Sequence, residues 1–125
     1  MQFHHIGVKC TNMDESLRFY TEVMGFEISE QVEVMGHPCI FLEKGGARIE
    51  LESLGAATQA PAGPPNAGLT HFAFYVDDIE AVSAGLRARG AAFFLPPFKV
   101  RPTRKTAFIK GPDAVLIQLI QDIAG

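Results

Sequence analysis

The feature that most constrains the fold of this chain is a weak internal repeat that starts at two histidines. His5 and His71 each lie near the beginning of a short run rich in β-forming residues. When these two histidines are aligned, residues 12–15 coincide with residues 78–81, and both segments carry signals for the start of a helix. Later strand signals also align, with a shift of two positions. We therefore expect a tandem duplication rather than a solenoid, which needs three or more repeats.

Length and composition narrow the class of protein. The chain has 125 residues, the size of one domain, and 47% of them are hydrophobic, enough to build a core. The net charge of −3 argues against a general nucleic-acid binder, because such proteins carry a basic surface. We see no signal peptide, and we expect Cys10 and Cys39 to be buried thiols in the cytoplasm. No apolar run approaches the ~18 residues of a membrane-spanning helix.

Local signals within each half predict the order strand, helix and three strands. In the first half Asn12 and Glu15 form a capping-box pattern, and apolar residues then recur at helical spacing until a glycine. In the second half Asp77 or Asp78 caps a helix that Gly90 ends. The predicted strands cover residues 3–9, 26–34, 39–43 and 47–53 in the first half, and residues 69–76, 91–94, 103–109 and 114–121 in the second.

Turns and a linker separate these elements. Residues 35–38 predict a turn, and Pro96 with Pro97 is expected to break the sixth strand, because proline lacks the N–H that a ladder needs. Residues 54–68 are rich in alanine, proline and glycine without periodicity, so we interpret them as a linker. The expected organisation is a single domain, 1–125, with module one about 1–53 and module two about 69–125.

Alternation along the strands separates apolar from polar side chains on the two faces of each sheet. Ile49 and Leu51, for example, share one face of their strand, and Glu50 lies on the other. We expect the two amphipathic helices to pack against these apolar faces. The polar residues left on the opposite faces are His5, Glu50, His71 and Gln118. Such residues within strands are usually hydrogen-bonded or bound to a ligand, because burying an unpaired polar group is costly.

Seven short segments carry a resemblance to known proteins: residues 5–8, 16–20, 23–26, 49–51, 71–78, 111–113 and 117–119. Together they resemble the vicinal oxygen chelate superfamily over essentially the whole chain. That superfamily includes glyoxalase I, methylmalonyl-CoA epimerase, extradiol dioxygenases, and fosfomycin and bleomycin resistance proteins, and the resemblance is closest to the glyoxalase-like lyases. It implies an α+β fold of two tandem βαβββ modules. Each module would be a curved mixed β-sheet with a helix packed on its outer face, and together they would form a metal-binding cup.

The resemblance also implies four ligands for a divalent metal, on the first and last strands of each module. By position these ligands are His5, Glu50, His71 and Gln118. Glyoxalase-like members usually have glutamate at the fourth position, whereas Gln118 can coordinate through its carbonyl oxygen but cannot accept a proton. This ligand set would leave two positions of an octahedron open. It suits Ni²⁺, Co²⁺, Zn²⁺, Mn²⁺ or Fe²⁺ without choosing among them.

The function that the resemblance implies is a metal-dependent isomerase or lyase of the glyoxalase I type, that is, a lactoylglutathione lyase-like enzyme. It would act by enediolate chemistry on a small carbonyl or thioester substrate, with Glu50 as the catalytic base. Arg101, Arg104 and Lys105 would bind an anionic tail, such as that of a glutathione or CoA conjugate, unless they are ordinary solvated surface. Single-domain members are usually homodimers, so we expect a homodimer acting on a small molecule, with neither nucleic acid nor membrane as partner.

Two other functions stay open. A methylmalonyl-CoA epimerase-like enzyme would need two bases on opposite faces of the substrate carbon, and Gln118 weakens that interpretation. A metal-free binding protein of the bleomycin-resistance type would keep the cup, but such members usually lack the histidines found here. An extradiol dioxygenase is the least favoured, because its iron carboxylate is expected where Gln118 stands.

Three further polar residues, His4, His37 and Glu52, are candidates for a role at the site. His4 has the opposite parity to His5, which predicts that it faces the helix. His37 lies in a predicted turn and is expected to face solvent. Glu52 shares the face of Glu50 and is either a second acid or base or a solvated strand end.

Overall fold

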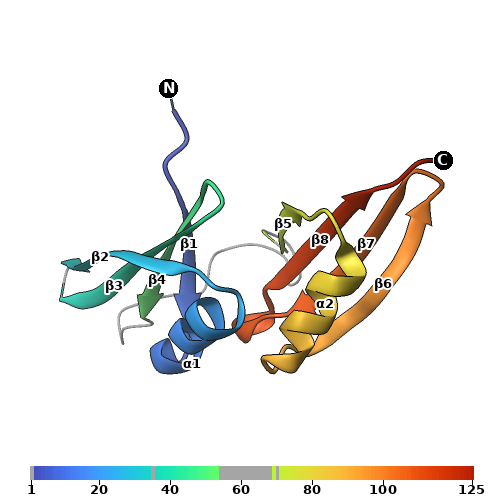
Figure 1. Cartoon of the computed structure of the whole chain (residues 1–125). Coiled ribbons are helices and arrows are strands. Elements are labelled where there is room, and N and C mark those ends of the chain that lie inside the picture. The colour runs from blue at the N-terminus through green and yellow to red at the C-terminus, as the bar shows by residue number, and fades with distance from the viewer. Residues whose placement is uncertain (1, 35, 54–68, 70) are drawn as a thin grey trace. The chain divides into compact units, whose positions relative to one another are not determined.

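The structure, a computed structural model, describes residues 2–34, 36–53, 69 and 71–125 (Figure 1). The described residues form the predicted order βαβββ twice. The chain divides into two compact units, Met1–Ala67 and Gly68–Gly125, one for each repeat. The predicted linker, residues 54–68, lies outside the described residues.

Each unit contains one four-stranded mixed sheet and one helix. The first unit contains β1 (Ile6–Cys10), α1 (Met13–Arg18), a π-helical turn η1 (Phe19–Val23), β2 (Glu27–Val34), β3 (His37–Lys44) and β4 (Ala47–Ser53). The second contains β5 (His71–Tyr75), α2 (Ile79–Ala88), β6 (Phe93–Arg101), β7 (Arg104–Lys110), a 3₁₀ turn η2 (Pro112–Ala114) and β8 (Leu116–Asp122). The strand orders, β1-β4-β3-β2 and β5-β8-β7-β6, are the same in both units. The pairs β1–β4 and β5–β8 are parallel, and all the other strand pairs in the two sheets are antiparallel.

Side-chain caps start both helices where the sequence predicts. Asn12 Oδ1 accepts a hydrogen bond from the backbone N–H of Glu15 at 3.0 Å. Asp78, rather than Asp77, is the second cap, and its Oδ1 accepts from the N–H of Ala81 at 3.1 Å. The helix predicted to follow Asn12 is confirmed, although its second half is the π-helical turn Phe19–Val23.

The apolar faces form the core as the alternation predicts. Ile49 and Leu51 of β4 are buried and pair in register with residues of β1, and α1 packs against β4. In the second unit Ile117 and Leu119 of β8 are buried and α2 contacts the same sheet. Figure 1 shows each helix lying against its own sheet. The opposite face of each sheet is therefore the one that carries the predicted site residues.

Several predicted strand boundaries are wrong. β1 begins at Ile6 rather than at residue 3, and β3 begins at His37, because a tight turn at Gly36, with φ of +82°, lets His37 pair with Val34. β6 continues through Pro96 and Pro97 instead of ending before them. It is an edge strand whose pairing with β7 shifts register around the prolines, and an edge strand tolerates a missing N–H.

The predicted burial of both cysteines is confirmed. Cys10 and Cys39 are both buried, and neither forms a disulfide. Among the described residues, none of the helices combines the length and the apolar character needed to cross a membrane.

Candidate metal and acid–base site

The two predicted ligands of the first unit lie in contact. His5 immediately precedes β1, and β1 runs parallel to β4 in a register that pairs Gly7 with Glu50. His5 Nε2 lies 3.4 Å from Glu50 Oε1, and their side chains are 32% and 13% exposed. An imidazole nitrogen and a partly buried carboxylate oxygen therefore point at the same place on the polar face of this sheet.

A second carboxylate, that of Glu52, lies beside Glu50. Both carboxylates lie next to Gly7 of β1, since a Cβ added there would be in ordinary van der Waals contact with Glu52 Oε2 at 3.6 Å and with Glu50 Oε1 at 3.9 Å. Burial raises the pKa of Glu50, the hydrogen bond and charge of Glu52 raise it further, and His5 only partly opposes them. The surroundings of Glu50 therefore disfavour its anionic form more than His5 stabilises it.

Cys39 is a neighbour of this site that sequence reasoning did not find. It is buried on β3, pairs in register with Glu52, and its sulfur and the carboxylate oxygens of Glu50 and Glu52 lie within 4.8 Å of one another. The signal was present in the hairpin, because a two-residue turn at Gly45 and Gly46 pairs the strands in a register that places Cys39 opposite Glu52. Among the described residues, this trio could hold a metal ion.

His4 lies on the face of Glu50, and the prediction that it faces the helix is wrong. Its ring lies 6.3 Å from that of Phe41, which pairs in register with Glu50. Its Nδ1 lies 2.7 Å from Nδ1 of His5. The alternation rule failed because residues 3–5 precede β1, so the pleat of a strand does not direct their side chains.

Arg48 extends this group of side chains along the same face. Its Nη1 lies 2.7 Å from His4 Nε2, and its Nε and Nη2 donate to Glu43 Oε1 at 3.0 and 2.8 Å. The hydrogen bond from Arg48 is the main reason why the pKa of Glu43 is lowered. His37, predicted to face solvent, is partly exposed at the start of β3.

The two predicted ligands of the second unit also share one face of their sheet. Gln118 pairs in register with Ala73, two residues after His71 on β5. Gln118 Nε2 donates to Thr106 Oγ1 at 2.9 Å, and the Thr106 hydroxyl donates to the Leu119 carbonyl at 2.9 Å. With the amide nitrogen held by Thr106, the carbonyl oxygen is the atom of Gln118 that suits a metal.

Comparisons with known proteins agree with this architecture. The family model described as the Glyoxalase/Bleomycin resistance protein/Dioxygenase superfamily matches residues 2–119. The chain is a member of this superfamily.

Similar proteins carry related names. The chain is 34% identical to a probable lactoylglutathione lyase of Vibrio cholerae, over 94% of this chain and 88% of that protein. It is 31% identical to a probable lactoylglutathione lyase of Vibrio parahaemolyticus, with the same two coverages. Among solved structures, a glyoxalase family protein from Enterococcus faecalis is 26% identical with a TM-score of 0.78, covering 95% of this chain and 96% of that one. Each of these likenesses covers at least 94% of this chain.

The basic residues predicted to bind an anionic tail do not all face the same way. Arg104 donates to Asp122 Oδ1 at 2.7 Å, and Lys105 lies 3.5 Å from Glu80 of α2. The two are adjacent on β7, so they project to opposite faces of the sheet. Arg101 is exposed and pairs in register with Arg104 across the β6–β7 turn. Arg101 and Arg104 therefore share the face that carries Gln118, whereas Lys105 lies on the helix side.

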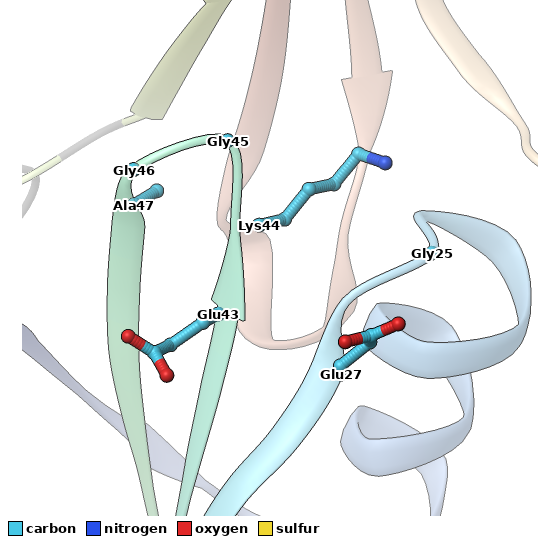
Figure 2. Close-up of a pocket in the computed structure, with 7 residues that line it drawn as sticks. All are labelled: Gly25, Glu27, Glu43, Lys44, Gly45, Gly46 and Ala47. Atoms are coloured by element: carbon cyan, nitrogen blue, oxygen red, sulfur yellow. The ribbon is translucent and has the colours of Figure 1, made fainter.

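A separate hollow of about 470 Å³ lies at the β3–β4 hairpin of the first unit (Figure 2). Its lining residues are Gly25, Glu27, Glu43, Lys44, Gly45, Gly46 and Ala47. None of the predicted ligands lines it. Figure 2 shows the Lys44 side chain reaching from the hairpin, and its Nζ would lie 3.2 Å from a Cβ added at Gly25.

Proposed function

We propose that this superfamily member is a metal-dependent isomerase or lyase of the glyoxalase I type. It would act by enediolate chemistry on a small carbonyl or thioester substrate. The observation that carries the proposal is the 3.4 Å contact between His5 Nε2 and Glu50 Oε1 beside a second carboxylate, Glu52. The names of the two similar Vibrio proteins, both probable lactoylglutathione lyases, support it.

A divalent cation fits the donor atoms of the first unit. Imidazole nitrogen and carboxylate oxygen are both ligands for first-row metals. Burial and Glu52 raise the pKa of Glu50 and so disfavour its anion, which a bound cation would stabilise. We propose that His5 and Glu50, together with His71 and Gln118, hold the metal, which is Ni²⁺, Co²⁺, Zn²⁺, Mn²⁺ or Fe²⁺. When bound, it would polarise a substrate carbonyl as a Lewis acid.

Glu50 would be the base. Its carboxylate would take the proton from the hydroxyl-bearing carbon next to the carbonyl. The electron pair of the broken C–H bond would form the C=C bond of the enediolate, and the π pair of the carbonyl would move onto its oxygen. The protonated Glu50 would then return the same proton to the former carbonyl carbon, while the hydroxyl proton of the first carbon passes to the former carbonyl oxygen and leaves a new carbonyl behind. Burial and Glu52 bring the pKa of Glu50 upward, which suits a base that works closer to neutral pH. A single base suffices for this shift, whereas an epimerase needs a second base that Gln118 cannot be.

The test combines metal analysis with an assay. Freshly purified protein should contain near-stoichiometric divalent metal, and a chelator should abolish turnover of the hemithioacetal of methylglyoxal and glutathione. Adding back Ni²⁺ or Zn²⁺ should restore it. A protein that holds no metal and binds aromatic or cationic ligands would instead support the bleomycin-resistance type of binding protein. Failure to turn over the hemithioacetal with all five metals would exclude the lyase.

We further propose a homodimer in the cytoplasm with a glutathione or CoA conjugate as substrate. Arg101 and Arg104 are the side chains best placed for its anionic tail, because both lie on the face of Gln118. Light scattering after size-exclusion chromatography tests the dimer. An Arg101→Ala variant tests the tail, and it should raise KM for the conjugate while leaving kcat near that of the unchanged protein. An unaltered KM would show that Arg101 does not bind the anionic tail of the substrate.

A further inference from the structure

A continuous path of polar contacts leads from Glu43 to the predicted ligand His5. Arg48 binds Glu43 through Nε and Nη2, and its remaining nitrogen, Nη1, lies 2.7 Å from His4 Nε2. His4 Nδ1 in turn lies 2.7 Å from His5 Nδ1, and His5 Nε2 lies 3.4 Å from Glu50 Oε1. The Arg48–His4 and His4–His5 distances are within the range of good hydrogen bonds.

The arginine determines the direction of these hydrogen bonds, because a guanidinium can only donate. His4 Nε2 must therefore accept, so the proton of neutral His4 is on Nδ1. His4 Nδ1–H then donates to His5 Nδ1, which must also accept. The proton of His5 consequently lies on Nε2, the nitrogen that faces Glu50. In this tautomer the Nε2 lone pair of His5 is not available to a metal.

Coordination through His5 Nε2 needs the opposite tautomer of both rings. His5 would carry its proton on Nδ1 and donate it to His4 Nδ1, as metal-bound histidines commonly donate their second N–H. His4 would then carry its own proton on Nε2. Each ring keeps one proton, but His4 Nε2–H and Arg48 Nη1–H would now face each other across 2.7 Å. Two donors cannot share that contact, so it has to open.

We propose that Arg48 is a positioning residue that acts through His4 to hold His5 in the tautomer unable to bind metal, so that metal loading releases Arg48 from His4. Glu43 retains the arginine after release, because its carboxylate binds Nε and Nη2 and not Nη1. This inference rests on the proposed function, since it takes His5 as a ligand. Its consequence is a site that binds its metal more weakly, and releases it more readily, than the same ligands would without Arg48.

The experiment is a double-mutant cycle of zinc affinity on the full chain, measured by competition with a chromophoric chelator. Arg48→Met should tighten zinc binding by about tenfold, because it removes a charge-assisted hydrogen bond made only in the metal-free state. In a His4→Ala background the same substitution should change the affinity by less than about twofold. Arg48→Lys keeps a donor toward His4 and should stay near the unchanged protein.

The cycle separates this mechanism from simple charge repulsion. If Arg48→Met tightens zinc equally with and without His4, the arginine acts through its charge and the proposal is overturned. An unchanged or weaker affinity in Arg48→Met would overturn it as well. Arg18→Met is the matched control, because Arg18 of the same unit also pairs with a carboxylate, that of Glu22 at 3.8 Å, and it should leave zinc affinity unaltered.

Nitrogen-15 chemical shifts of the imidazoles provide a readout that needs no metal. In the metal-free protein they should report a proton on Nδ1 of His4 and on Nε2 of His5, and zinc should reverse both. A metal-free His5 protonated on Nδ1 would overturn the inference. If the tautomers are as expected but no variant binds any of the five metals, the proposed function fails instead, and with it the coupling to metal.

Discussion

The two units repeat one arrangement of three side chains but surround it with different neighbours. In the first unit the His5 ring lies edge-on to Phe41 at 5.1 Å, and Phe41 pairs in register with Glu50. In the second unit the His71 ring lies edge-on to Phe108 at 5.9 Å, and Phe108 pairs in register with Gln118. The two units therefore have a histidine, a phenylalanine and an oxygen-bearing side chain at equivalent positions, although His5 lies just before its strand and His71 within it.

The neighbours of this trio differ in charge. Glu52 follows Glu50 by two residues on β4, whereas the equivalent residue of β8 is Ile120. Opposite them, Cys39 pairs with Glu52, and Thr106 pairs with Ile120. Arg48 also has an apolar counterpart, because the residue two before Gln118 is Leu116.

This difference separates two roles. The pKa of Glu50 is raised by burial and by Glu52, a shift in the direction that suits the base proposed above. Gln118 is a neutral amide whose nitrogen is held by Thr106, an arrangement suited to fixed coordination. We infer that the first module retained the acid–base chemistry and that the second supplies neutral ligands.

The largest expected effect on activity comes from replacing Glu50 by glutamine, the residue at the equivalent position of the second unit. Glu50→Gln should lower kcat/KM for the hemithioacetal by about 10³-fold, because general-base catalysis contributes ~10²–10⁴-fold. Steady-state kinetics with saturating metal, and metal content measured alongside, check this. Retention of more than about a tenth of the activity would show that Glu50 is not the base.

A core substitution asks whether the two units fold together. Leu51 and Leu119 occupy equivalent buried positions, and truncating either to alanine should cost ~2–5 kcal/mol of unfolding free energy. Urea titrations followed by far-ultraviolet circular dichroism measure the loss. A single shifted transition in both variants indicates one cooperative domain, as the sequence predicts, whereas two transitions of which only one shifts would indicate independent units.

Removing the second carboxylate should make the first unit electrostatically more like the second. Glu52→Gln should lower the pKa of Glu50 in the metal-free protein, leaving burial as its main cause of elevation. A pKa raised on folding stabilises the protein below the unfolded pKa, and this contribution is lost as pH rises through the folded pKa. Carbon-13 carboxyl shifts against pH test the direction, and an unchanged Glu50 pKa would show that Glu52 does not couple to it.

The smallest effect is expected at the exposed ion pair of the second unit. Arg104 lowers the pKa of Asp122, so the pair contributes stability above the unfolded pKa of aspartate, and this is lost as pH falls through the folded pKa. Asp122→Asn should therefore reduce the loss of stability on acidification only slightly, since the Asp122 side chain is 58% exposed. Urea midpoints at several acidic pH values measure it, and identical pH slopes in both proteins would show that the pair contributes nothing.

Much of the fold followed from local rules. Alternation along β4 and β8 correctly separated Leu51 and Leu119 from Glu50 and Gln118, because the pleat of a strand directs neighbouring side chains to opposite faces. The same rule failed at His4, which lies before the strand begins. The predicted sixth strand is too short, because the prolines were expected to end it. An edge position and shifts in register allow a strand to contain proline, and both are properties of the assembled sheet.

The sequence by itself determined the duplication, the order of elements and which face of each sheet is polar, since these depend on periodicity and on capping residues close in the chain. Only the tertiary structure decided which polar groups touch. Cys39 meets Glu52 through the pairing of β3 with β4, and Arg48 reaches His4 from 44 residues away. Strand register and side-chain reach set those contacts, and both are settled only when the whole sheet packs.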